Sequence, residues 1–264
     1  MKSRILVAVV GVPVLAWVVL AAPTLVMMAA LCLLSGIAAG ELMKCVGVKG
    51  KSLFNVLTIA AAACTVEWYY DRPELIALLW VVYVAAAFAC AIVKASEIKV
   101  VQVLAGLFAV IAIPYSFSAF LRIQAMGLHR AYLLLPFILS FACDTFAYFA
   151  GLTFGKHKLA PKVSPKKTVE GSIGGICGNV VCGLLFAFVM DRFFGGSIGY
   201  GAMAILAFCC SIVAQIGDLS FSLIKREFGV KDYGRLFLEH GGVLDRFDSV
   251  LFVAPVIELV LILI

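Results

Sequence analysis

Apolar runs constrain the fold of this chain more than any other feature. Nine of them, separated by short polar segments, lie at about residues 5–20, 24–40, 53–66, 75–93, 100–121, 131–152, 171–190, 200–222 and 248–264. A helix needs roughly 20 apolar residues to cross a bilayer, and most of these runs approach that length. Only 14% of the residues are charged, far below the roughly 25% that is usual in soluble domains. We therefore predict an all-α polytopic membrane protein with about nine transmembrane helices.

Basic residues between the runs predict the orientation of the chain. If the N-terminus is cytoplasmic, all but four of the 21 Lys and Arg residues fall on the cytoplasmic side, and the exceptions are Arg72, Arg122, Arg130 and Arg192. The positive-inside rule therefore favours a cytoplasmic N-terminus. This orientation also places the two long polar segments, 153–170 and 223–247, on the cytoplasmic face. No separate basic domain is visible, so we do not expect nucleic acid as a partner.

The two halves of the chain differ in their polar content. Residues 1–130 contain almost no motif that carries chemistry, and we interpret them as N-terminal transmembrane helices that form a lipid-facing scaffold. Residues 131–264 contain the long polar segments and the acidic residues discussed next. We expect these C-terminal transmembrane helices to carry the catalytic motifs on the cytoplasmic side.

Acidic residues inside apolar runs are a sharp signal of function. Asp144 lies in "CDTFAYFAG" and Asp218 in "QIGDLSFSLIKR". A carboxylate at membrane depth costs several kcal/mol unless it is paired, hydrated or bound to a metal. Helical spacing places Ser222, Lys225 and Arg226 on the same face as Asp218. This pattern indicates a buried functional acid beside a basic rim, and the alternative is an ion pair that only holds helices together.

The stretch "HGGVLDRFD" (240–248) precedes the last apolar run. Asp245 and Asp248 would share one side of a helix that begins there. Gly241 and Gly242 would let the backbone approach a ligand, and the nearby donors are His240, Lys231 and Arg246. Carboxylates beside several cations are typical of a site where magnesium and substrate phosphates bind together. A capping box or a salt-bridged loop is the alternative.

A second polar stretch, "SPKKTVEGSIGGICG" (164–178), leads from a basic loop into a glycine-rich helix start. Lys166 and Lys167 beside the backbone amides of a helix N-terminus make a plausible phosphate site. The alternative is a topology anchor, a role that adjacent lysines often have. The glycine pairs at spacing four predict close packing of this helix against a neighbour.

Together these stretches resemble the phosphatidate cytidylyltransferase family, also called CDP-diacylglycerol synthases. The resemblance covers about sixty residues. It rests on "CDTFAYFAGLTFGKHKLAPKVSPKKTVEGSIGG" and on Ser222, Lys225-Arg226, Lys231-Asp232, Gly234, His240-Gly241-Gly242, Asp245-Arg246 and Asp248. Where the family usually has Pro-Gly before the histidine, this chain has Leu238-Glu239.

The resemblance implies that CMP passes from CTP to phosphatidic acid, giving CDP-diacylglycerol and pyrophosphate in phospholipid biosynthesis. It implies a Mg²⁺ cofactor, with more than one ion expected. The expected metal ligands are Asp218, Asp245, Asp248 and Asp144. We expect the catalytic set to be Asp218, Asp245, Asp248, Lys225, Arg226 and Arg246. The expected substrate-binding residues are Lys166, Lys167, Ser222, Lys231, His240, Gly241 and Gly242.

The expected partners are CTP, phosphatidic acid and the lipid bilayer, with a homodimer left open. The expected location is a bacterial inner membrane with the active site on the cytoplasmic side. Two other functions remain as alternatives. A CTP-dependent lipid kinase of the polyprenol type would phosphorylate a lipid alcohol and release CDP. A secondary transporter would also hold intramembrane acids, but it would usually show two similar halves, and no repeat is visible.

Overall fold

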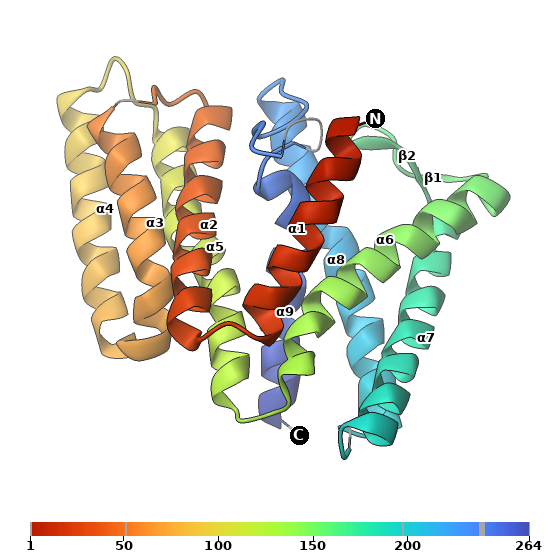
Figure 1. The fold of residues 1–264 in the computed structure, drawn as a ribbon. Helices are drawn as coiled ribbons and strands as arrows, with labels where there is room; N and C mark the ends of the chain where they lie inside the picture. The colour runs from red at the N-terminus through yellow and green to blue at the C-terminus, as the bar shows by residue number, and fades with distance from the viewer. Residues whose placement is uncertain (1, 51, 197, 238–240, 264) are drawn as a thin grey trace. The chain divides into compact units, whose positions relative to one another are not determined.

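The structure, a computed structural model, describes residues 2–50, 52–196, 198–237 and 241–263. Helices dominate these residues (Figure 1). In chain order the elements are α1 (Lys2–Leu20), α2 (Thr24–Cys45), α3 (Leu53–Asp71), η1 (Pro73–Leu75), α4 (Ile76–Val93), α5 (Val100–Ala125), η2 (Arg130–Leu134), α6 (Leu135–Phe154), β1 (Lys158–Ala160), β2 (Ser164–Thr168), α7 (Val169–Phe193), α8 (Tyr200–Glu227) and α9 (Leu244–Leu263).

Every predicted apolar run corresponds to an α-helix, so the prediction of an all-α polytopic membrane protein is confirmed. Within the described residues, six helical segments are long and apolar enough to cross a membrane: Thr24–Cys45, Pro73–Val93, Val100–Ala125, Arg130–Phe154, Val169–Phe193 and Tyr200–Glu227. The number of nine crossings and the cytoplasmic N-terminus stay predictions. The helix α8 continues beyond its apolar run to Glu227, which keeps Ser222, Lys225 and Arg226 helical as their spacing predicted.

The polar segment 153–170 contains a feature that the sequence did not predict. Here β1 and β2 pair as an antiparallel hairpin, with Lys158 opposite Thr168 and Ala160 opposite Ser164. The Thr168 hydroxyl then accepts a hydrogen bond from the Gly171 N–H at 3.1 Å and caps α7. A threonine at this position satisfies one of the amides that a helix N-terminus leaves without an intrahelical partner. The hairpin therefore fixes where α7 begins.

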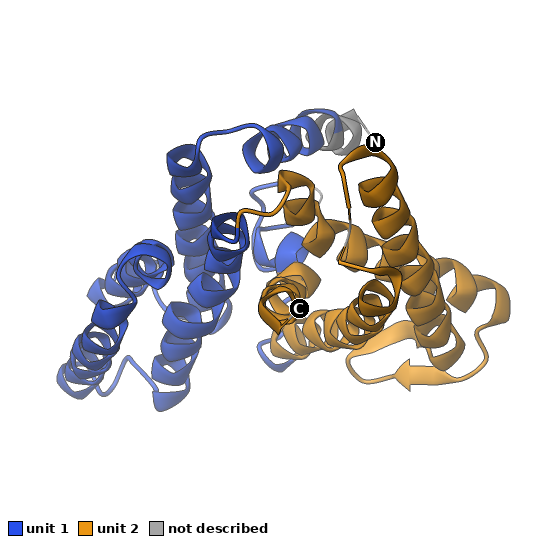
Figure 2. Cartoon of the chain, turned by 90° about the horizontal axis from the view of Figure 1, so that it is seen from below, with its two compact units in different colours: residues 1–126, 227–247 blue, residues 127–226, 248–264 orange. Residues whose placement is uncertain are grey.

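The chain divides into two compact units, which Figure 2 shows in different colours. Unit 1 comprises residues 1–126 and 227–247, and unit 2 comprises residues 127–226 and 248–264. The border thus crosses α9 near its start. Our division at residue 130 concerned where the motifs lie, and it stays a prediction.

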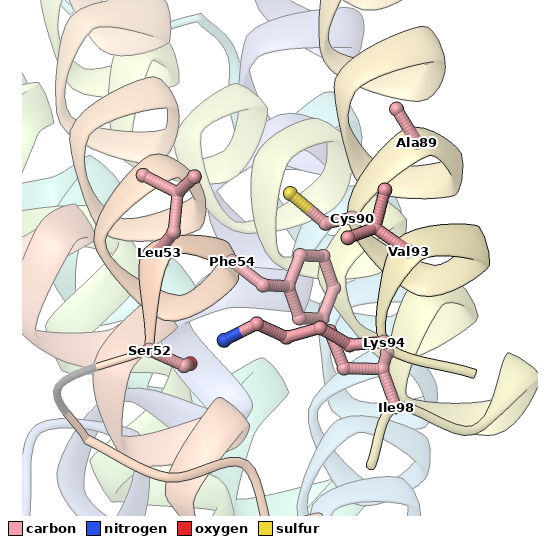
Figure 3. Close-up of a pocket in the computed structure, with 8 residues that line it drawn as sticks. All are labelled: Ser52, Leu53, Phe54, Ala89, Cys90, Val93, Lys94 and Ile98. Atoms are coloured by element: carbon pink, nitrogen blue, oxygen red, sulfur yellow. The ribbon is translucent and has the colours of Figure 1, made fainter. Parts of the chain in front are cut away.

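Unit 1 is built around α2, α3 and α5, with α4 packed against α3. Buried polar contacts tie these helices together. The Ser35 hydroxyl donates to the Ala62 carbonyl at 2.8 Å, and the hydroxyls of Thr58 and Tyr83 lie 2.8 Å apart. An apolar cavity of about 220 Å³ lies between the start of α3 and the end of α4, with Phe54 on its wall and Lys94 at its edge (Figure 3).

Unit 2 rests on the close packing of α6 against α7. Glycines make this approach possible. A Cβ at Gly175 would meet the Cys143 carbonyl oxygen at 2.9 Å, and a Cβ at Gly178 would overlap Cγ of Phe146. The predicted packing role of the glycine pairs is therefore confirmed. Further along, the Asn179 side-chain amide donates to the Ser211 hydroxyl at 2.9 Å and joins α7 to α8.

Candidate active site

A cavity of about 550 Å³ in unit 2 collects polar side chains from four consecutive parts of the sequence. Its polar lining residues are Asp144 and Tyr148 from α6, Lys158 from β1, Lys166, Lys167 and Thr168 from β2, Ser172 from α7, and Gln215 and Asp218 from α8. Apolar groups, including those of Leu152 and Leu159, complete the wall. The cavity is therefore amphipathic, with two carboxylates and three ammonium groups on its surface.

Asp218 is paired within this cavity. The Lys167 ammonium group donates to Oδ2 of Asp218, and the Ser222 hydroxyl donates to Oδ1 at 3.3 Å. Both members of the ion pair are partly accessible, with side-chain exposed fractions of 26% for Lys167 and 23% for Asp218. The sequence predicted a free-energy cost for burying the Asp218 carboxylate. A lysine from the hairpin offsets this cost. The pair remains open to a ligand that enters the cavity.

Three of the four predicted metal ligands lie near one another in unit 2. Asp144 is exposed to the cavity, and its carboxylate lies close enough to interact electrostatically with Asp218 and Lys167. Asp248, in the second turn of α9, interacts electrostatically with Asp218, Asp144 and Lys225. The helices α8 and α9 approach closely here, because a Cβ at Gly217 would meet the Asp248 carbonyl oxygen at 2.9 Å. Like charges gathered in this way attract cations.

Metal binding by protein groups alone is not indicated. Across the part of the chain that the structure describes, no three His, Cys, Asp or Glu side chains are arranged to hold a metal ion. A magnesium ion commonly takes one or two carboxylates from the protein and fills its other positions with water and substrate phosphates. The carboxylates of Asp144, Asp218 and Asp248 are compatible with that kind of site. Their role as ligands stays a prediction.

The predicted basic residues of unit 2 have different surroundings. Lys166 and Lys167 line the cavity as expected. Lys225 interacts electrostatically with Asp248. Arg226 donates from Nε to the Val163 carbonyl oxygen at 3.4 Å, which connects the end of α8 to the hairpin.

The remaining predicted residues belong to unit 1. Oδ2 of Asp245 accepts hydrogen bonds from the Tyr233 N–H at 2.8 Å and from the Gly242 N–H at 2.9 Å. Gly241 has a φ of +84°, which favours glycine, whereas Lys231 and Arg246 are exposed. Asp245 thus closes its own loop in this structure, as the capping alternative expected, and its role as a metal ligand stays a prediction. His240, Leu238 and Glu239 lie outside the described residues.

Sequence reasoning missed several polar residues of these two regions. Gln215 lies one turn before Asp218 on the same helix face, and its Oε1 accepts from the Ser172 hydroxyl at 2.5 Å. Lys158 and Tyr148 also line the cavity. Glu41 is buried in α2 and accepts hydrogen bonds from the Val243 and Leu244 N–H groups at the start of α9. The available signal for Glu41 was an acidic residue directly after the apolar run 24–40, but its backbone partners could not be read from the sequence.

Comparison with known proteins connects this geometry to a family. The family model described as "Cytidylyltransferase family" matches residues 2–264. This chain belongs to that family. It is 45% identical over 139 residues to a phosphatidate cytidylyltransferase of Staphylococcus saprophyticus, a match that covers 53% of this chain and 51% of the relative.

Other cytidylyltransferases agree with this match. Over 156 residues the chain is 42% identical to phosphatidate cytidylyltransferases of Staphylococcus haemolyticus and Staphylococcus aureus, with 59% of this chain and 58% of each relative covered. The chain therefore spans a little over half the length of the curated relatives it matches. The three lysines of the cavity of unit 2 make it a candidate anion-binding site.

Proposed function

We propose that this protein is a phosphatidate cytidylyltransferase, which transfers CMP from CTP to phosphatidic acid. The observation that carries the proposal is the cavity of unit 2, where three lysines and two carboxylates meet in a helical, apolar protein. Lysines suit the phosphates of both substrates, and carboxylates suit the magnesium that accompanies a nucleoside triphosphate. The names of the family and of its staphylococcal members support this choice of substrates.

The reaction needs little proton transfer. The phosphate of phosphatidic acid has a second pKa of about 6, as other phosphomonoesters do, so it is largely ionised at neutral pH. One of its oxygens forms a bond to the α-phosphorus of CTP, and the bond from that phosphorus to the bridging oxygen breaks. Pyrophosphate leaves with the electron pair, and CDP-diacylglycerol remains in the membrane. No general base is required for this step.

The residues of the cavity would bind and orient the two anions. Lys166 and Lys158 lie where they can neutralise phosphate charge, and the ammonium group of Lys167 already lies against a carboxylate. When phosphate enters, we expect Lys167 to share its donors between Asp218 and the ligand. Positioning and charge neutralisation are the main sources of rate enhancement in phosphoryl transfer.

Magnesium fits this donor set. We propose that more than one ion takes part, and that each ion takes one or two of the carboxylates of Asp218, Asp144 and Asp248 together with substrate phosphates. When bound, magnesium supplies charge neutralisation at the phosphates. The mutual electrostatic interaction of these three carboxylates supports this proposal, because a cation between them would relieve their repulsion.

The place of the reaction follows from the lipid. We propose that the protein lies in a bacterial inner membrane with its active site on the cytoplasmic side, where CTP is available. The acyl chains of phosphatidic acid then stay in the bilayer while its headgroup reaches the polar segments. A homodimer remains compatible with this arrangement. The concentration of Lys and Arg in predicted cytoplasmic segments supports the orientation.

The test uses the full chain purified in detergent with CTP, phosphatidic acid and magnesium. We expect pyrophosphate and lipid-linked CMP to form in equal amounts, and chelation of magnesium to stop both. Diacylglycerol and a polyprenol serve as alternative acceptors. Release of CDP with either alcohol, without pyrophosphate from phosphatidic acid, would replace this proposal with a lipid kinase.

A further inference from the structure

Glu41 binds the backbone immediately before α9, a contact that none of the motifs above includes. Its side chain belongs to α2 and is only 9% exposed. Oε1 accepts a hydrogen bond from the Val243 N–H, and Oε2 accepts one from the Leu244 N–H, each at 3.0 Å. These amides lie at the start of α9, where a helix leaves N–H groups without intrahelical acceptors. A carboxylate at this end also interacts favourably with the helix dipole.

The loop is shaped to admit this carboxylate. A Cβ at Gly234 or at Gly242 would coincide with the carboxyl group of Glu41, so only glycine leaves room for it at both positions. Neither glycine needs a positive φ for its own turn, because the structure records none for them. The close approach of Glu41 is therefore the physical reason for glycine at Gly234 and Gly242.

Two carboxylates thus organise the same segment of unit 1. Asp245 binds the Tyr233 and Gly242 amides from within the segment, and Glu41 binds the next two amides from α2. The segment is additionally anchored by a tilted contact between the rings of Phe247 and Phe117, with ring centroids 5.6 Å apart. Arg246 follows directly and is exposed. The position and direction of the first turn of α9 therefore depend on Glu41.

We propose that Glu41 is a positioning residue for cytidylyl transfer: it holds the start of α9 and thereby orders Gly241, Gly242 and Arg246, which the sequence predicted to take part in the reaction. The inference rests on the proposed function. Glu41 acts through the backbone of Val243 and Leu244 and touches no substrate itself. Its contribution is to remove the cost of ordering this segment when the nucleotide binds.

The variant that tests this is Glu41→Gln, and the matched control is Gln102→Leu. An amide has one oxygen, so Glu41→Gln leaves one of the two N–H groups facing an NH₂ group. Gln102 is also 9% exposed in unit 1, and it accepts from the Lys99 N–H at 3.0 Å and donates to the Val46 carbonyl at 2.9 Å. Gln102→Leu removes hydrogen bonds to Lys99 and Val46, neither of which belongs to residues 228–248.

Two readouts separate positioning from general stability. Hydrogen exchange should become faster in a peptide covering 241–248 in Glu41→Gln and stay unchanged there in Gln102→Leu. The kcat/KM for CTP should fall about tenfold or more in Glu41→Gln, since one lost charge-assisted hydrogen bond has effects of that order. Gln102→Leu should lower the melting temperature about as much as Glu41→Gln does. Its kcat/KM per folded molecule should stay near that of the wild type.

Gly234→Ala provides a second route if Glu41→Gln does not fold. The added Cβ would push the Glu41 carboxylate away from the loop, although the sequence of α2 is unchanged. The proposal expects the same faster exchange at 241–248. Unchanged exchange at 241–248 in the folded variant, or equal losses of kcat/KM in Glu41→Gln and Gln102→Leu, would overturn it. Wild-type protein that is inactive with CTP and phosphatidic acid would defeat the proposed function, whereas the exchange measurement would still decide whether Glu41 holds the segment.

Discussion

At the scale of single residues, the pairing of Lys167 with Asp218 explains how an acid is kept in an apolar helix. A carboxylate there needs a partner, and the hairpin supplies one. Breaking such a pair usually costs more than the pair contributes, because the other charge is left behind. Asp218 also accepts from Ser222 within its own helix. Both contacts hold the carboxylate where it lines the cavity.

Asp218→Asn should abolish most activity and should also lower stability, because Lys167 loses its ionic partner. The amide keeps the shape of the side chain but removes the charge that we assign to magnesium and to Lys167. We expect kcat to fall by roughly 10²-fold to 10³-fold, the usual effect of losing one electrostatic group in an active site. The control is Asp71→Asn, whose carboxylate makes an exposed pair with Arg72 at 3.4 Å. Normal magnesium-dependent activity in Asp218→Asn would remove Asp218 from the metal site.

Two lysines of the same hairpin allow the effect of a phosphate contact to be distinguished from the effect of net charge. Lys166 lines the cavity, whereas Lys162 lies at the exposed turn between β1 and β2 and does not line it. Lys166→Ala should raise the KM for CTP about tenfold, the change expected for one lost charged contact of the kind that phosphates accept. Lys162→Ala, with the same change in net charge, should leave KM unchanged in steady-state kinetics. Equal effects would mean that only overall charge matters.

At the scale of elements, α6 and α7 pack through glycines in a way that positions the cavity. Asp144 and Tyr148 come from the same stretch of α6 that the glycines of α7 contact. The Thr168 cap fixes the start of α7, where Lys166 and Lys167 end the hairpin. The packing therefore determines the distance between the acid on α6 and the lysines on β2.

Gly178→Ala tests this packing. The added methyl group would collide with the ring of Phe146, and overpacking of this kind typically costs about 1–3 kcal/mol. We expect a lower melting temperature in detergent. Gly201→Ala in α8, where a Cβ would meet only open space, should be neutral or slightly stabilising. A melting temperature for Gly178→Ala equal to that of Gly201→Ala would contradict the tight contact.

The sequence predicted the helices well because long apolar runs permit few other structures in a membrane. It did not predict the hairpin of β1 and β2, whose strands are short and polar and have no alternating pattern to indicate them. Asp144 and Asp218 were predicted as site residues because they are acids inside apolar runs. Lys166 and Lys167 were predicted because they lie beside a helix N-terminus. Glu41 was missed because its partners are backbone amides, which a sequence pattern does not reveal.

At the scale of the whole molecule, the distribution of basic residues is the main argument for orientation. The chain has a net charge of +6, and its lysines concentrate in the segments between predicted crossings that would face the cytoplasm. Anionic lipids and CTP are both met on that side. The charge pattern therefore supports the proposed reaction at the inner surface of the membrane.

Reporter fusions test this orientation. A reporter that is active only outside the cytoplasm should be active when fused after Pro73 and inactive when fused after Lys162. Arg72 is one of the few basic residues predicted to lie outside, whereas Lys162 belongs to the basic hairpin. The opposite pattern, measured at equal expression, would place the cavity of unit 2 on the wrong side for CTP.

The central claim is that the α-phosphorus of CTP, with its cytidine, is transferred to phosphatidic acid. The most direct measurement follows two radioactive labels, with CTP carrying ³²P at either the α or the γ position. Purified protein, phosphatidic acid and magnesium should move the α label into the lipid fraction and leave the γ label in pyrophosphate. Entry of the γ label into lipid, or of neither label at a magnesium concentration above that of CTP, would contradict the account.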